Sequence, residues 1–167
     1  MASLAGLKID AFEFARDGRV QDGTISLAEF PRLLDLLHEF VGELRVHVEG
    51  SRDSERQSWL RLTGSGVVVL QCQRCLERID FPIDFDSHLQ LSADDVDAVN
   101  WSVDELDNDE FDIIPGNQDL LVKDLVEDEL ILLLPVSPMH EACALPESGV
   151  ISQKPSPFAV LAKLKKH

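Results

Sequence analysis

Two stretches in the middle of the chain alternate between apolar and polar residues. The apolar positions are Leu44, Val46 and Val48 in the first stretch, and Ile79, Phe81, Ile83, Phe85, Leu89 and Leu91 in the second. A period of two places alternate side chains on opposite faces of a strand. Because consecutive amphipathic strands favour antiparallel pairing, we expect a meander sheet over residues 43–91. Pro82 indicates an edge or a bulge in its strand.

Between these stretches the pattern predicts a hairpin. Trp59–Thr63 and Val67–Gln71 are rich in strand-forming residues, and Gly64-Ser65-Gly66 separates them. Glycine between two such runs is a turn signal.

Other segments have helical periodicity. Apolar residues recur at helical spacing near 27–40, where Pro31 fits the first turn, and again over 119–134, where Pro135 ends the pattern. A short C-terminal helix is expected after Ser156-Pro157. These helices and the meander sheet predict an α+β fold.

The domain organisation follows from these elements and from composition. Residues 1–134 are expected to form a single α+β domain with an acidic insert at 92–118. Residues 135–153 are a proline-rich linker, and residues 154–167 are a basic C-terminal tail. With 167 residues, the chain is long enough to bury a core.

The charge is strongly uneven along the chain. The formal net charge is −16, and residues 79–122 contain thirteen acidic residues but no Lys or Arg. The last fourteen residues carry four Lys and no acid. The acidic block should repel a phosphate backbone and attract a basic protein, although the same acids also serve solubility.

No apolar run is long enough to span a bilayer, so no membrane partner is expected. The N-terminal residues lack the pattern of a secretory signal, and three cysteines do not suit a closed disulfide framework. We therefore expect a cytoplasmic protein.

Cys72-Gln73-Arg74-Cys75 follows one expected strand and precedes another. This spacing lets a tight turn direct two thiolates at one metal ion. His140 and Cys143 form an HxxC pair in the linker, and the four residues together would suit tetrahedral zinc. Three reduced thiols and a surface histidine remain the alternative.

Enzyme motifs are absent from the sequence. It contains no phosphate-binding P-loop and no nucleophile elbow, and we expect neither a catalytic residue nor a small-molecule substrate. The candidate contacts to RNA or a protein partner are Arg45, Trp59, Arg61, Arg74 and Arg78 in the expected strands and the turn between them, and Phe158, Lys163, Lys165 and Lys166 in the tail. A tryptophan such as Trp59 also commonly covers part of a core.

Three segments resemble the YceD family, whose bacterial members are called large ribosomal RNA subunit accumulation proteins. They are QCQRCLE at 71–77, DLLVKDLVEDELILLLPVSPMHEAC at 119–143 and QKPSPFAVLAKLKKH at 153–167. The resemblance implies a non-enzymatic role in the accumulation or processing of large-subunit (23S) ribosomal RNA. It also implies a link to ribosomal protein L32.

Three hypotheses follow. The first is an assembly factor that contacts a basic ribosomal protein, with RNA contacts confined to the tail and the arginines of the sheet. The second is a zinc- or thiol-dependent enzyme. The third is an acidic chaperone of basic ribosomal proteins that does not contact RNA.

Overall fold

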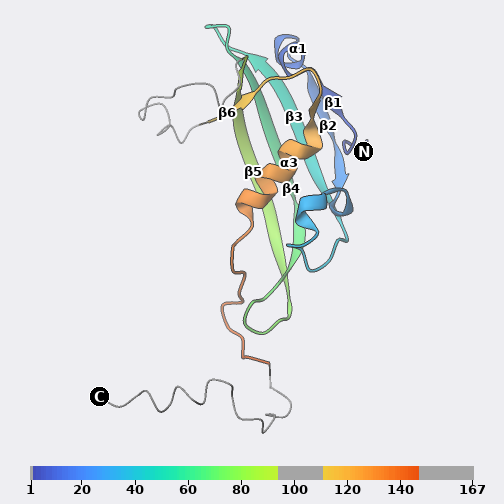
Figure 1. Cartoon of the computed structure of the whole chain (residues 1–167), viewed down its shortest axis with the longest axis vertical. Helices are drawn as coiled ribbons and strands as arrows, with labels where there is room; N and C mark the ends of the chain where they lie inside the picture. The colour runs from blue at the N-terminus through green and yellow to red at the C-terminus, as the bar shows by residue number, and fades with distance from the viewer. Residues whose placement is uncertain (1, 94–110, 147–167) are drawn as a thin grey trace, which may run out of the picture.

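A five-stranded sheet dominates the structure, a computed structural model that describes residues 2–93 and 111–146 (Figure 1). The strand order is β2-β3-β4-β5-β6, and the first four strands form an antiparallel meander. Their bounds are β2 Val20–Ser26, β3 Glu43–Arg52, β4 Ser58–Gln71, β5 Arg78–Ser92 and β6 Asp112–Pro115. Strand β6 pairs with the end of β5 in parallel orientation. The α+β fold with a largely antiparallel sheet is therefore confirmed.

Short elements surround this sheet. Helix α1 is Ala11–Arg16 and is capped by Asp10, whose side chain accepts a hydrogen bond from the backbone N–H of Glu13. Helix α3 is Val122–Leu133, and the 3₁₀ helices η1 and η2 are Leu27–Glu29 and Pro31–Leu33. A two-residue ladder joins β1, Lys8–Ile9, to β7, Leu120–Leu121. None of the helices in the described ranges is long and apolar enough to cross a membrane.

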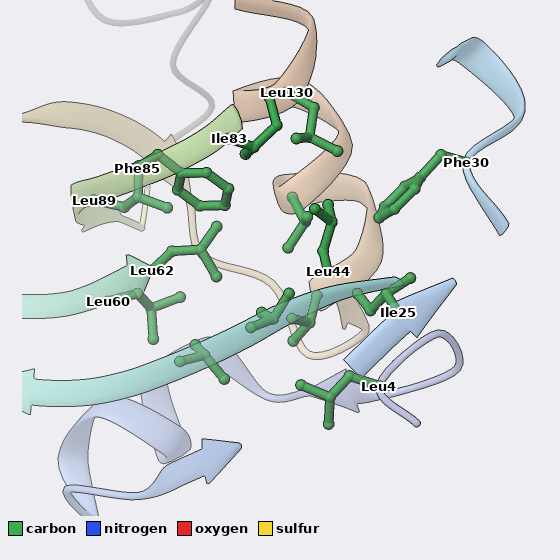
Figure 2. Packing of buried hydrophobic residues seen from close by; sticks show 14 of the residues in the cluster. Leu4, Ile25, Phe30, Leu44, Leu60, Leu62, Ile83, Phe85, Leu89 and Leu130 are labelled. Carbon is green, nitrogen blue, oxygen red and sulfur yellow. The ribbon is translucent and has the colours of Figure 1, made fainter. Parts of the chain in front are cut away.

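The core lies between one face of the sheet and helix α3. The alternating residues Leu44, Leu60, Leu62 and Ile83 are buried, and Leu130 of α3 joins them in the same apolar cluster (Figure 2). The polar residues between them point to the opposite face of the sheet. The buried face expected from the period of two is therefore confirmed for β3 and β5.

The helix expected over 27–40 is replaced by η1, η2 and a turn. Two backbone N–H groups of this segment have partners elsewhere: Arg32 donates to the carboxylate of Glu127, and His38 donates to the carbonyl of Val69. Strand β3 pairs with β4 only up to Ser65, so the edge of β4 beyond that point is open to the His38 backbone. Tertiary partners thus take hydrogen-bond donors that a continuous helix would use internally.

The hairpin expected around residues 64–66 is also wrong, because β4 runs unbroken through them. A Cβ added at Gly64 would lie 2.3 Å from the ring of Phe85, and one at Gly66 would lie 2.5 Å from Leu44. These glycines therefore make room for core side chains instead of forming a turn. Pro82 lies on a part of β5 that β6 does not reach, consistent with the expected edge.

Other segments differ in smaller ways. Residues 1–24, for which the sequence pattern predicts no helix or strand, contribute β1, α1 and part of β2, and the acidic insert contributes β6. Helix α3 begins at Val122 instead of Asp119. Residues 135–146 form no helix or strand. The expected C-terminal helix and basic tail lie outside the described residues.

Candidate metal centre

The turn between β4 and β5 carries the first two cysteines. Two backbone hydrogen bonds close it: Cys72 donates to the carbonyl of Glu77 at 2.9 Å, and Leu76 donates to the carbonyl of Cys72 at 3.0 Å. Leu76 adopts a left-handed conformation with φ of 65°, which is uncommon for a branched side chain. The closed turn holds both cysteines on the side that faces the segment after α3.

The chain that leaves α3 runs along this turn. Gln73 donates its backbone N–H to the carbonyl of Pro138 at 2.9 Å, and the guanidinium of Arg74 donates to the carbonyl of His140 at 2.9 Å. These contacts bring residues more than sixty positions apart in the sequence into one place. His140 and Cys143 thereby reach the two cysteines of the turn.

The four side chains converge. The sulfur atoms of Cys72 and Cys143 are 3.7 Å apart, and Nδ1 of His140 is 3.3 Å from the sulfur of Cys75. All four donor atoms lie within 4.8 Å of one another. Cys72 is buried and the other three are partly buried, and none of the three cysteines forms a disulfide.

The imidazole of His140 is held from its far side. Nε2 lies 3.2 Å from the carbonyl oxygen of Arg78, which can only accept a hydrogen bond. In the tautomer that makes this bond, Nε2 carries the proton and Nδ1 presents its lone pair to the sulfur atoms. This arrangement prepares Nδ1 to act as a metal ligand.

The surroundings of the cluster favour the charged sulfur at Cys72 and the neutral thiol at Cys75. Burial raises the pKa of Cys72, but three backbone N–H groups donate to its sulfur and bring the pKa down to about 5. These groups belong to Arg74, Cys75 and His140. The N–H of Glu77 lowers the pKa of Cys75, but burial and the neighbouring sulfur atoms outweigh it and raise that pKa.

Arg74 supplies the positive charge beside the cluster. Its Nε lies 2.9 Å from the sulfur of Cys143, and the hydrogen bond to that sulfur raises the pKa of Arg74 above its ordinary value. The side chain is therefore occupied by the cysteine cluster and by the His140 carbonyl, although the sequence presents it as a candidate RNA contact.

The other candidate arginines lie on the solvent-facing side of the sheet. Arg61 makes two hydrogen bonds to the carboxylate of Asp86, at 2.8 and 2.6 Å. Arg78 pairs with Asp80 at 2.6 Å and with Glu39 at 3.5 Å. Arg45 is exposed on β3 and has no ion-pair partner within the described ranges.

Trp59 is fixed by two neighbours. Its indole Nε1 donates to Asp53 at 3.0 Å, and its ring meets the ring of Phe111 edge-on at a centroid distance of 5.0 Å. Because Phe111 contacts this ring, Trp59 helps to anchor the chain that enters β6. Of the candidate contact residues, the four in the tail, Phe158, Lys163, Lys165 and Lys166, lie outside the described residues.

Sequence reasoning missed an apolar groove beside the cluster. It has a volume of 420 Å³, and its lining includes Leu36, Leu37, Ile131, Val136 and Pro138. Its walls come from the segment after η2, from α3 and from the chain that leads to the cysteine cluster. No local pattern could have revealed it, because tertiary packing alone brings these segments together.

Comparison with known proteins places the chain in a family. A family model described as "Large ribosomal RNA subunit accumulation protein YceD" matches residues 60–165. A Haemophilus influenzae protein with the same name is 38% identical over 112 residues, which cover 59% of this chain and 60% of that protein. No solved structure matches the chain. The matched range includes both halves of the cysteine cluster, and the chain belongs to the YceD family.

Proposed function

We propose that this protein supports the accumulation of large-subunit (23S) ribosomal RNA by binding a basic ribosomal protein, such as L32. The family description names RNA accumulation and no reaction, and we assign the chain a non-enzymatic role. The H. influenzae relative has the same description, but the match spans only 60% of its length. The surface of this chain supports a mode of action through a basic protein partner.

The observation that carries the proposal is the acidic solvent-facing side of the sheet. On β2, β3 and β5 the residues that point away from the core include the acids Asp22, Glu43, Glu49, Asp80, Asp84 and Asp86. The arginines that point the same way are Arg45 on β3, Arg61 on β4 and Arg78 on β5, half as many as these acids. A surface with this excess of negative charge attracts a basic partner and accelerates its association.

The ion pairs of the arginines strengthen this argument. Arg61 is held by Asp86 and Arg78 by Asp80, so a phosphate group would have to displace a carboxylate from each. The neighbouring acids would also repel that phosphate. Direct RNA contact is therefore assigned to the basic residues 154–167, where four lysines stand without an acid.

The test compares binding of the purified full chain to isolated 23S ribosomal RNA and to purified L32 over a series of salt concentrations. We expect L32 to bind more tightly than RNA at every salt concentration. A variant that neutralises the acidic face should bind L32 at least tenfold more weakly at low salt. Its three substitutions are Glu43→Gln, Glu49→Gln and Asp84→Asn.

A matched variant removes three exposed charges elsewhere, by Glu29→Gln, Asp35→Asn and Glu55→Gln. It should bind L32 nearly as well as the unmodified chain. If the two variants lost affinity for L32 equally, binding would depend on the net charge of the chain and not on the acidic face. Tight RNA binding with no affinity for L32 would overturn the proposed mode of action. In cells, the acidic-face variant should fail to restore 23S ribosomal RNA in a strain that lacks the protein.

A further inference from the structure

We propose that Cys72, Cys75, His140 and Cys143 bind one Zn²⁺ ion, which clasps the segment after α3 to the β4–β5 turn. Such an ion would hold the chain's own shape whether or not the protein binds a ribosomal protein. The positions of the four donor atoms and the groups around them support this assignment.

The donor distances match a tetrahedral site. With Zn–S bonds of about 2.3 Å and a Zn–N bond of about 2.0 Å, tetrahedral angles place two sulfurs about 3.8 Å apart and a sulfur and a nitrogen about 3.5 Å apart. The corresponding distances here are 3.7 Å for Cys72 and Cys143 and 3.3 Å for Cys75 and His140. The other pairs of donor atoms are at most 4.8 Å apart, so the β4–β5 turn and the segment after α3 need to approach only slightly to bind the ion.

The ligand types select the metal. Three thiolates and one imidazole suit Zn²⁺, while hard cations such as Mg²⁺ and Ca²⁺ prefer oxygen ligands. Four protein ligands fill a tetrahedral zinc ion and leave no position for water or substrate. The site therefore has the composition of a structural metal centre.

The surroundings complete the site. A zinc ion with three thiolates and a neutral imidazole has one net negative charge, and the guanidinium of Arg74 lies against the sulfur of Cys143. The carbonyl of Arg78 accepts from Nε2 of His140 and orients its ring. Hydrogen-bond partners that orient and neutralise metal ligands are typical of zinc centres and contribute to affinity.

The position of the site predicts what the metal does. The two ligand pairs are separated by more than sixty residues, so the ion closes a long loop between the hairpin turn and the chain after α3. Gln73 and Pro138, joined by a backbone hydrogen bond, also line the apolar groove. Loss of the metal should therefore loosen one wall of the groove and leave the sheet intact.

The first experiment measures metal content. The reduced full chain is loaded with Zn²⁺, dialysed and analysed, and we expect one zinc per chain. Replacement with Co²⁺ should give the intense visible absorption of a tetrahedral cobalt ion and the near-ultraviolet band of cobalt–thiolate bonds. A folded, reduced chain that retains no zinc would overturn the proposal.

Variants identify the ligands. Cys75→Ser and His140→Ala should lose zinc, whereas His140→Cys should retain it because thiolate replaces imidazole. His88→Ala is the matched control, since His88 is an exposed histidine on β5 near Asp86. Circular dichroism shows whether each variant is folded. Zinc retained in full by both Cys75→Ser and His140→Ala would contradict the assignment.

Hydrogen exchange tests the clasp itself. Adding a chelator to the full chain should increase exchange at least tenfold at the backbone N–H of Gln73 and over residues 135–143. The protection of β3 and the first half of β4 should change little. Mass spectrometry of the unreduced protein provides a further check, because a Cys72–Cys143 disulfide formed in place of metal binding would also overturn the proposal.

Discussion

The side-chain carboxylate of Glu127 accepts two hydrogen bonds from Arg32, one from its backbone N–H at 2.6 Å and one from its guanidinium at 3.0 Å. The Glu127 side chain is 2% exposed, while that of Arg32 is 48% exposed. The pair joins α3 to η2 across the edge of the core. The hydrogen bonds from Arg32 stabilise the buried carboxylate of Glu127, while the guanidinium of Arg32 remains partly in contact with solvent.

Replacing Arg32 with Ala should destabilise the protein by about 2–3 kcal/mol, because it leaves the buried carboxylate with only the backbone donor. Asp128→Ala removes an exposed partner of the same arginine and should cost less than about 1 kcal/mol. Urea unfolding of the two variants measures the difference. Equal losses would mean that the buried carboxylate is not the source of the stabilisation.

Gly50 permits α1 to lie against β3. A Cβ at this position would be 2.5 Å from the carbonyl oxygen of Phe14, a backbone atom that cannot move without shifting the helix. We expect Gly50→Ala to lower the free energy of unfolding by about 1–3 kcal/mol. Gly6→Ala is the control, because nothing lies within 4 Å of its added Cβ. In thermal melts, the melting temperature of Gly50→Ala should be well below that of Gly6→Ala. The reverse order would contradict this packing.

The hydrogen bond from the indole of Trp59 to the carboxylate of Asp53 should make the stability of the protein depend on pH. The indole N–H lowers the pKa of Asp53, and the backbone N–H groups of Gln57 and Glu55 lower it further. The folded pKa thus lies below the unfolded value of about 3.9. The contribution to stability is present above pH 3.9 and is lost as the pH falls through the folded pKa.

We therefore expect the indole N–H resonance of Trp59 in NMR spectra to titrate with a midpoint below the ordinary pKa of aspartate. Trp59→Phe assigns the resonance, and Asp53→Asn should abolish its titration. A midpoint at or above about 3.9 would show that the indole does not stabilise the carboxylate.

The basic tail provides a functional prediction that rests on sequence alone, since residues 147–167 lie outside the described part of the chain. Phe158, Leu161 and Leu164 recur at helical spacing beside the lysines. A helix this short needs a surface on which to dock. Phe158→Ala should therefore impair rescue of 23S ribosomal RNA at least as much as Lys165→Ala with Lys166→Ala. Full activity of Phe158→Ala, with loss in the lysine variant, would favour direct phosphate binding.

The local sequence pattern was sufficient for the elements that pack one continuous apolar side against the core. The alternation in β3 and β5 places one side of each strand in the core, and α3 has an apolar stripe that the sheet covers. In these elements, the secondary structure that the local sequence favours is also the one that buries the apolar side. The CxxC spacing likewise indicated a turn with two converging thiols, and the structure contains that turn.

Tertiary contacts decided the rest. The helix expected near 27–40 does not form, because Glu127 and Val69 accept hydrogen bonds from backbone N–H groups of this segment. Neither acceptor is a neighbour in sequence. Gly64 had the appearance of a turn residue, but its missing side chain makes space for Phe85.

The cysteine cluster shows the same division between sequence and tertiary structure. The sequence by itself determined the ligand types and the spacing within each pair, because a tight turn or a short loop fixes which side chains point the same way. Only the tertiary structure decided that the two pairs meet. Their meeting depends on where α3 crosses the sheet and on backbone bonds such as Gln73 to Pro138, which no local pattern encodes.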